Sequence, residues 1–250
     1  MKLDSSYFLV AHGSRDPRHQ FGLEKVAHLL YTRLATLSEG TLSPSDIAPR
    51  VGSGTLELNE DALHQQLCLF GEYTLSLGLT EVQILPLFLL LGVHVKDDIP
   101  AEVAIAQEIL GQKVKLNLRA HLGSQKEGLI DWVNREIETV SPQTQWILLA
   151  HGSRRVGGNA TVEEVAQEVG AISAYWAVSP SLEQQVHHLV RDGHYRIGIL
   201  PYFLFSGAIT DAIVQQVKQL KEQYHAVEFY LTNPLDANHE LINLVWNLID

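Results

Sequence analysis

Residues 7–15 read YFLVAHGSR and residues 146–154 read WILLAHGSR, so both stretches end in the same five residues. The offset between the two histidines is 151 − 12 = 139 positions. Downstream, ILPLFL at 84–89 is matched by ILPYFL at 199–204, and a third, shorter match lies between these pairs. Because the matches recur in the same order, the sequence indicates two copies of one design, a duplicated domain and not a solenoid.

Each half of the repeat alternates between strand-like and helix-like segments. The apolar runs at 7–11 and 146–150 are typical of strands buried on both faces of a parallel sheet. The pattern predicts further strands over 51–58, 82–89, 114–120, 172–178, 196–203 and 227–231. It predicts helices over 18–37, 60–77, 97–110, 126–139, 161–169, 182–191, 208–223 and 238–249. Strands separated by helices favour βαβ units, so the expected fold class is α/β, with two similar halves that each contain a parallel sheet flanked by helices.

The halves are separated by a short polar stretch, Ser141-Pro142-Gln143. We therefore expect an N-terminal domain over residues 1–142 and a C-terminal domain over residues 143–250. The helix at 126–139 is then a connection at the end of the first domain.

The composition disfavours several classes of function. The chain has 250 residues, 46% of them hydrophobic, and 18 basic against 29 acidic residues give a formal net charge of −11. This acidity disfavours binding to nucleic acid or to an anionic membrane. The single cysteine, Cys68, excludes an intrachain disulfide and a four-cysteine metal site. The longest apolar run, at 84–93, is shorter than the about 20 residues of a membrane span, and no signal-peptide pattern opens the chain, so we expect a cytoplasmic protein.

Residues that can bind a metal follow three strands of the N-terminal half. His12 comes directly after the first strand, Glu57 lies near the end of the second, and His94 follows the third by a few residues. In open parallel sheets, ligands bind outside the carboxyl ends of the strands, so these side chains can converge at one edge. Two imidazoles and a carboxylate form a reasonable divalent-metal site of mixed N and O donors, and they include groups that accept protons near neutral pH.

Each of these residues also has an ordinary structural interpretation. A histidine after a buried strand can bind loop backbone, and the repeated AHGSR is consistent with turn geometry alone, with glycine for an unusual φ and serine as a helix cap. Glu57 has Glu60 and Asp61 nearby, and one of the three could be a helix-cap carboxylate. His94 alone is equally compatible with a solvated helix start. No nucleotide-binding motif and no Gly-x-Ser-x-Gly elbow occurs, which argues against nucleotide enzymes and α/β-hydrolases.

Two motifs resemble those of a known family. LVAHGSRDPR at 9–18 is similar to the opening motif of the sirohydrochlorin chelatases, the class II tetrapyrrole chelatases of the CbiX and SirB kind. LPLFL at 85–89, which leads to GVHVKDDIP at 92–100, resembles the second signature of that family. The likeness runs along the whole chain and fits the long form of the family. It implies two flavodoxin-like halves that face each other across a cleft. Because one chain contains both halves and needs no partner chain, we expect a monomer.

The resemblance implies a lyase-type metal chelatase. Such an enzyme inserts a divalent metal into sirohydrochlorin and releases two protons, with Fe²⁺ for sirohaem or Co²⁺ for cobalamin synthesis. Metal binding and catalysis are then assigned to His12, Glu57 and His94. The metal is a substrate alongside sirohydrochlorin, and no tightly bound cofactor is implied.

Two other classes of function stay open. A metal or tetrapyrrole carrier of the same fold would use the same three residues without inserting the metal. A phosphatase with a histidine after its first strand would want an arginine immediately before it, where this chain has Ala11.

The C-terminal half keeps His151 but departs from the family pattern elsewhere. Ile209 stands where the repeat places the second histidine, and residues 175–178, YWAV, offer no carboxylate opposite Glu57. We therefore expect one metal site, in the N-terminal half, and a degenerate site in the other.

The acidic substrate implied by the family requires a local site rich in positive charge or N–H groups, despite the net charge of −11. Arginine side chains and helix N-termini after each His-Gly-Ser turn can supply it. The substrate-binding candidates are Ser14, Arg15, Arg18, His151, Ser153 and Arg154.

Overall fold

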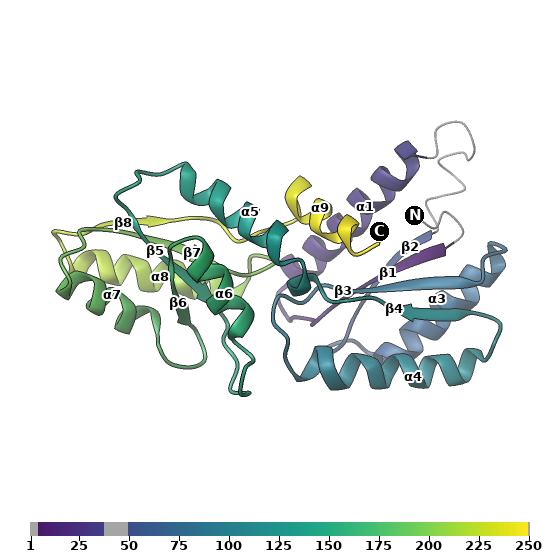
Figure 1. Ribbon diagram of the computed structural model, residues 1–250. Helices are drawn as coiled ribbons and strands as arrows, with labels where there is room; N and C mark the ends of the chain where they lie inside the picture. The colour runs from purple at the N-terminus through teal and green to yellow at the C-terminus, as the bar shows by residue number, and fades with distance from the viewer. Residues whose placement is uncertain (1–4, 38–49, 250) are drawn as a thin grey trace. The chain divides into compact units, whose positions relative to one another are not determined.

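A computed structural model describes residues 5–37 and 50–249 (Figure 1). Contacts divide the chain into two compact units, one made of residues 1–125 and 237–250 and the other of residues 126–236. Each unit contains a four-stranded parallel sheet with helices packed on it, which confirms the expected α/β class and its two similar halves. The opening residues, on which the expectation of no signal peptide depends, lie outside the described ranges.

The first unit has the strand order β2-β1-β3-β4, in which every neighbouring pair is parallel. Its strands are β1 (Ser5–Ala11), β2 (Val51–Thr55), β3 (Glu81–Pro86) and β4 (Lys115–Leu118). Its helices are α1 (Pro17–Leu37), α3 (Leu63–Ser76), the π-helix η2 (His94–Asp98), α4 (Ile99–Leu110), the short 3₁₀ helix η3 (Leu122–Ser124) and the C-terminal α9 (His239–Asn247). The order reverses between β1 and β3, and such a switch point is where α/β sheets bind ligands.

The second unit repeats this topology with the order β6-β5-β7-β8, again parallel throughout. Its strands are β5 (Gln145–Ala150), β6 (Ile172–Tyr175), β7 (Arg196–Pro201) and β8 (Glu228–Leu231). Its helices are α5 (Lys126–Glu138), α6 (Ala160–Glu168), α7 (Leu182–Arg191) and α8 (Ala208–Gln223). The equal topology explains why the sequence repeats in the same order along the chain.

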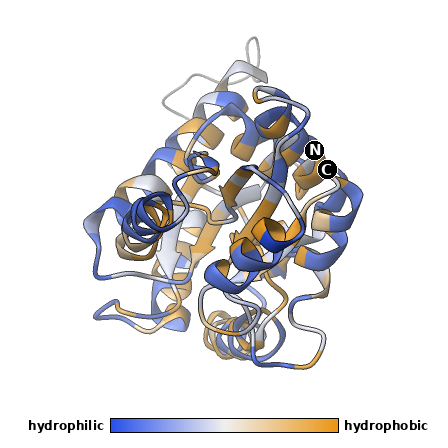
Figure 2. Cartoon of the chain, turned by 90° about the vertical axis from the view of Figure 1, so that its left-hand side faces the viewer, coloured by the Kyte–Doolittle hydropathy of each residue, from blue (hydrophilic) through white to orange (hydrophobic). Residues whose placement is uncertain are grey.

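The central strands form the core of each unit because both of their faces are covered. All seven residues of β1 are buried, as are the last five of β5. On one face of the first sheet, Phe8, Val10 and Ile84 pack against apolar residues of α3 and α4. On the corresponding face of the second, Ile147, Leu149 and Ile199 pack against α7 and α8. Figure 2 shows the hydrophobic colour along the strands, as expected for parallel strands without a solvent-exposed face.

Several predicted strands end earlier than their apolar patterns do. The strand expected over 82–89 ends at Pro86, although Leu87 and Leu89 beyond it are only 2% and 7% exposed. The strand expected over 51–58 ends at Thr55. Apolar patterns indicate burial and not sheet pairing. Leu87 and Leu89 stay buried outside the sheet, whereas Glu57 and Leu58 lie in an exposed loop, so the pattern could not locate either strand end.

The apolar run at 84–93 is shared between β3 and the irregular chain that leads to His94. In the part of the chain that the structure describes, no helix combines the length and the apolar character needed to cross a membrane.

Two helices pack in a different unit from the one that their position in the sequence predicts. Helix α9 lies along α1 (Figure 1), where the Arg33 guanidinium sits 4.6 Å from the centre of the Trp246 ring. Helix α5 packs in the second unit, where Lys126 pairs with Glu164 at 3.0 Å. The compact units therefore differ from the domains expected at 1–142 and 143–250, because the helix at 126–139 belongs to the second unit and the last helix to the first.

This arrangement predicts that Trp246→Ala destabilises the first unit. Trp246 is 8% exposed, and its removal loses both apolar burial and the contact with Arg33, so we expect unfolding to become easier by about 3 kcal/mol. Native-state hydrogen exchange should accelerate in β1 and not in β5. The matched variant is Trp132→Ala in α5, which is 1% exposed and should accelerate exchange in β5. Faster exchange of β5 in Trp246→Ala would contradict the assignment of α9.

Candidate metal centre

Three residues from separate loops of the first unit meet beyond the carboxyl ends of its strands. His12, Glu57 and His94 each offer one ligand atom, and these atoms all lie within 4.8 Å of one another. His12 and Glu57 are exposed, and His94 is half-buried. The structure therefore brings together the three side chains that the sequence predicted would converge, in a geometry that a single metal ion could bridge.

Backbone hydrogen bonds bring the first two ligands together. Beyond β1 and β2, the Leu56 N–H donates to the Ala11 carbonyl and the Glu57 N–H donates to the His12 carbonyl, both at 2.9 Å. The two strands thus stay linked for two residues after the regular sheet ends. Glu57 is fixed beside His12 by this pairing, and the alternatives Glu60 and Asp61 lie further along the loop.

Gly13 makes this close approach possible. Its φ is +102°, and a Cβ built there would lie 2.0 Å from the Glu57 carbonyl oxygen. Any other residue at position 13 would push the loop that carries Glu57 away from the loop that carries His12. The glycine of the repeated AHGSR thus has a specific role in the site.

His94 is oriented by an aromatic neighbour and by the turn that follows it. Its ring lies 4.7 Å from the ring of His12, centre to centre, at an interplanar angle of 86°. The Phe88 ring lies 6.3 Å from His12 and 6.2 Å from His94. His94 opens the π-helix η2, which runs directly into α4, so the ligand stands at the start of a rigid helix.

A fourth residue, Asp98, supports the site without being one of the three ligands. Its Oδ2 lies 2.7 Å from His94 Nδ1, and His12 Nδ1 lies 3.2 Å from the Gly13 carbonyl oxygen. With Nδ1 of both rings engaged, Nε2 is the nitrogen left for a metal. A carboxylate bound to the second nitrogen of a metal-binding histidine fixes the ring and raises its basicity. Sequence analysis missed Asp98, although the i, i+4 spacing in HVKDD is the signal that indicates it.

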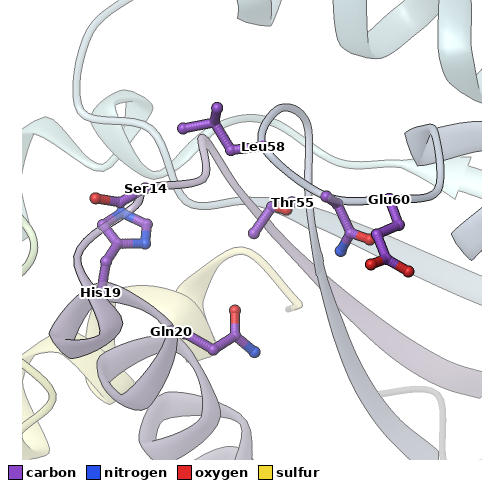
Figure 3. Close-up of a pocket in the computed structure, with 7 residues that line it drawn as sticks. Ser14, His19, Gln20, Thr55, Leu58 and Glu60 are labelled. Carbon is purple, nitrogen blue, oxygen red and sulfur yellow. The ribbon is translucent and has the colours of Figure 1, made fainter.

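A polar pocket of about 280 Å³ lies next to Glu57. It is lined by Ser14, His19, Gln20, Thr55, Leu58, Asn59 and Glu60. Figure 3 shows Ser14, His19 and Gln20 on one side, Glu60 on the other and Leu58 at the upper edge. Burial lowers the pKa of His19, and the nearby His12 lowers it further, so the imidazole facing this pocket favours its neutral form.

The predicted substrate-binding residues of the first half lie in the turn between β1 and α1. Arg18 Nη2 pairs with Asp16 Oδ2 at 2.6 Å, and hydrogen bonds from Arg18 lower the pKa of that carboxyl to about 2. Ser14 accepts a hydrogen bond from the Asp16 N–H at 3.0 Å. Arg15 is exposed. Ser14 and Arg18 thus make hydrogen bonds within this segment, and binding of substrate by Ser14, Arg15 and Arg18 stays a prediction.

The second unit repeats the turn after its first strand and keeps His151, but it lacks the other two candidate ligands. The Ala177 N–H donates to the His151 carbonyl at 2.9 Å, so Ala177 occupies the place of Glu57. Ile209 follows Pro201 by eight residues (209 − 201), as His94 follows Pro86 (94 − 86), and Ile209 packs against the apolar core. Within residues 5–37 and 50–249, no group of three potential metal ligands forms around His151.

The other predicted residues of this half, Ser153 and Arg154, lie beside His151. The Ser153 N–H donates to Asn159 Oδ1 at 2.7 Å, and its hydroxyl accepts from the Arg155 N–H at 3.2 Å. Arg154 is exposed. Binding of substrate by His151, Ser153 and Arg154 stays a prediction.

The close approach at Gly13 predicts that Gly13→Ala weakens metal binding. The methyl group would displace the Glu57 loop, so we expect the Kd for Co²⁺, followed by its absorption spectrum, to rise at least about tenfold. The control is Gly92→Ala, because a Cβ at Gly92 meets no atom within 4 Å. Equal Co²⁺ affinities in the two variants would show that the Gly13 turn does not set the site.

The Asp98 contact predicts a separate effect on His94. In Asp98→Ala, the His94 ring loses its hydrogen-bond acceptor, and loss of such a partner typically reduces metal affinity about 10- to 100-fold. The same Co²⁺ titration measures it, with thermal melting to confirm the fold. Asp97→Ala, at the exposed neighbouring position, is the matched variant and should keep wild-type affinity.

The comparisons with known proteins identify the family to which this chain belongs. The CbiX family model matches residues 6–140 and 145–250. A sirohydrochlorin ferrochelatase from Priestia megaterium is 26% identical over 185 residues, which cover 70% of this chain and 68% of that protein. A sirohydrochlorin cobaltochelatase from the same organism is 24% identical over 240 residues, covering 90% of this chain and 72% of that protein.

Solved structures share the fold over the whole chain. SirB from Bacillus subtilis with Fe³⁺ superposes with a TM-score of 0.73 at 21% identity, covering 100% of this chain and 94% of that one. CbiX, described as the terminal enzyme for biosynthesis of siroheme in denitrifying bacteria, gives 0.63 at 19% identity, covering 98% and 97%. Since the family model matches both halves of the repeat, this chain belongs to the CbiX family, as its motifs indicated.

Proposed function

We propose that this protein is a sirohydrochlorin chelatase that inserts Fe²⁺ or Co²⁺ into sirohydrochlorin and releases two protons. The observation that carries the proposal is the cluster of His12, Glu57 and His94, whose ligand atoms lie within 4.8 Å of one another. Its curated relatives named for this chemistry include both a ferrochelatase and a cobaltochelatase. In the balanced reaction, the metal replaces the two pyrrole N–H protons of the macrocycle.

The ligand set suits a metal that must be given up. Three protein ligands leave coordination positions to water or substrate, unlike the closed four-ligand sites of structural metals. His12 and Glu57 are exposed, so a macrocycle can approach the ion from solvent. Imidazole and carboxylate donors accept both Fe²⁺ and Co²⁺, so these ligands do not select between the two metals.

The same residues can take the protons. Once the metal has left, His12 and Glu57 become free to act as general bases beside the macrocycle. Asp98 holds His94 Nδ1, which fixes that ring while the metal departs. We assign proton acceptance to the pair His12 and Glu57 jointly.

The substrate's carboxylates need positive partners. Arg18 already pairs with Asp16, so its charge is partly neutralised, and Arg15 is the better partner in this turn. Arg154 and His151 are the corresponding candidates in the second half. The protein would act as a monomer, because one chain contains both halves.

A metal carrier is the alternative. It would bind Co²⁺ through the same three ligands without accelerating formation of the metallated macrocycle. Turnover therefore distinguishes a carrier from a chelatase, while metal affinity does not.

Anaerobic mixing of the protein with sirohydrochlorin and either Fe²⁺ or Co²⁺, followed by absorption spectroscopy, tests the proposal. We expect insertion faster than in the protein-free control, and a loss of at least about 100-fold in His94→Ala, because metal and substrate are no longer positioned. His188→Ala, an exposed histidine of α7, is the matched variant and should keep the wild-type rate.

Binding of Co²⁺ without any acceleration would favour the carrier. His151→Ala separately tests the second half, and we expect it to weaken sirohydrochlorin binding while Co²⁺ affinity stays at the wild-type value.

A further inference from the structure

Leu58, the residue after the ligand Glu57, is in two unfavourable situations at once. Its side chain is 58% exposed, and its backbone has a φ of +59°. A left-handed conformation is strained for a leucine and comfortable for glycine or asparagine, and an exposed leucine gains nothing from the hydrophobic effect. Neither feature stabilises the free protein, which points to a role in binding.

A second exposed aliphatic residue precedes another ligand. Val93 is 48% exposed and lies immediately before His94. Between the two histidine rings and the core lies Phe88, at 6.3 Å from His12 and 6.2 Å from His94. Large apolar side chains thus adjoin two of the three ligands in the chain, and one of them, Leu58, forms the edge of the neighbouring pocket (Figure 3).

The second unit provides a natural comparison, because it has the same turns without a metal site. Val178 follows Ala177 as Leu58 follows Glu57, but it is half-buried and packs on Gly152. Its backbone is not left-handed: among the described non-glycine residues, only Leu58 and Asp236 have a positive φ. The position of Val93, seven residues after the strand end, is taken by Ala208 (93 − 86 = 208 − 201). At these two positions, a large exposed aliphatic side chain therefore occurs in the unit that has the candidate ligands and not in the other.

We propose that Leu58 and Val93 form an apolar rim that receives the flat, apolar face of the tetrapyrrole substrate. This inference rests on the proposed chelatase function and adds the residues that position the ring. Carboxylate contacts can hold the periphery of the macrocycle, whereas only contact with its face fixes the height of the pyrrole nitrogens above the metal. A rim beside Glu57 and His94 places that contact next to the ion, so Leu58 and Val93 are substrate-positioning residues.

Variants of the rim separate ring binding from metal binding. Leu58→Asn removes the apolar side chain and suits a left-handed backbone, so its melting temperature should equal or exceed the wild-type value. Val93→Thr keeps the shape and adds a hydroxyl group. We expect the Kd for metal-free sirohydrochlorin, measured by anaerobic fluorescence titration, to rise about tenfold in Leu58→Asn. We expect KM for sirohydrochlorin to rise in both variants, with the Kd for Co²⁺ unchanged.

Exposed aliphatic residues elsewhere in the first unit serve as controls. Leu69→Gln in α3 and Ile109→Thr in α4 change residues that are 61% and 63% exposed and do not line the pocket. Both should keep the wild-type Kd and KM for sirohydrochlorin.

The possible outcomes distinguish failure of the proposed rim from failure of the proposed chelatase function. If the wild type inserts metal and the rim variants have its Kd and KM for sirohydrochlorin, the proposed rim is wrong and the proposed chelatase function is supported. If the rim variants lose Co²⁺ affinity as well, Leu58 and Val93 act through the ligands and the rim is again wrong. If the wild type neither binds sirohydrochlorin nor accelerates metal insertion, both the proposed chelatase function and the proposed apolar rim are wrong.

Discussion

The backbone hydrogen bond between the Glu57 N–H and the His12 carbonyl, 2.9 Å long, is the contact on which the site depends. It continues the pairing of β1 and β2 past the end of the sheet, where parallel strands open their ligand-binding edge. The bond can form only because position 13 has no Cβ, since the Glu57 carbonyl occupies the space that one would need. One glycine therefore allows an imidazole and a carboxylate from distant parts of the sequence to lie within reach of a single ion.

The duplicated unit shows that the fold does not need the site. His151 and Ala177 make the same backbone hydrogen bond as His12 and Glu57, at the same length. What changed is the side chains: alanine replaces the carboxylate, and Ile209 replaces the second histidine and joins the core. An isoleucine in contact with the core stabilises the helix start that a half-exposed histidine leaves open. Position 209 thus contributes to the core of the second unit, where the corresponding position of the first unit holds a candidate metal ligand.

The repeat predicted the fold class, the strands and the convergence of His12, Glu57 and His94, because these follow from apolar periodicity and from the rule that parallel strands end at a common edge. Other features depend on tertiary contacts that no local pattern encodes. The choice of Glu57 over Glu60 depends on a backbone bond, and the packing of α9 on α1 depends on Arg33 and Trp246. The end of β3 was missed because Leu87 and Leu89 stay buried beyond the sheet, and the end of β2 was missed because the β-like pattern runs on into the exposed loop that carries Glu57 and Leu58. Asp98 has a local signal in its i, i+4 spacing from His94, but that spacing alone does not show that the two side chains meet.

The electrostatics of the site suit transfer of a metal better than its storage. Two neutral imidazoles and one carboxylate leave a divalent ion with a residual positive charge, which a dianionic macrocycle neutralises more completely than the protein does. Asp98 moderates this imbalance from outside the ligand set, through a hydrogen bond and not through a bond to the metal. A second carboxylate, as a fourth protein ligand, would neutralise the remaining positive charge of the ion and oppose its release. The open, undercharged site thus suits the proposed release of the ion to the substrate, with the exposed His12 and Glu57 as the proposed acceptors of the two pyrrole protons.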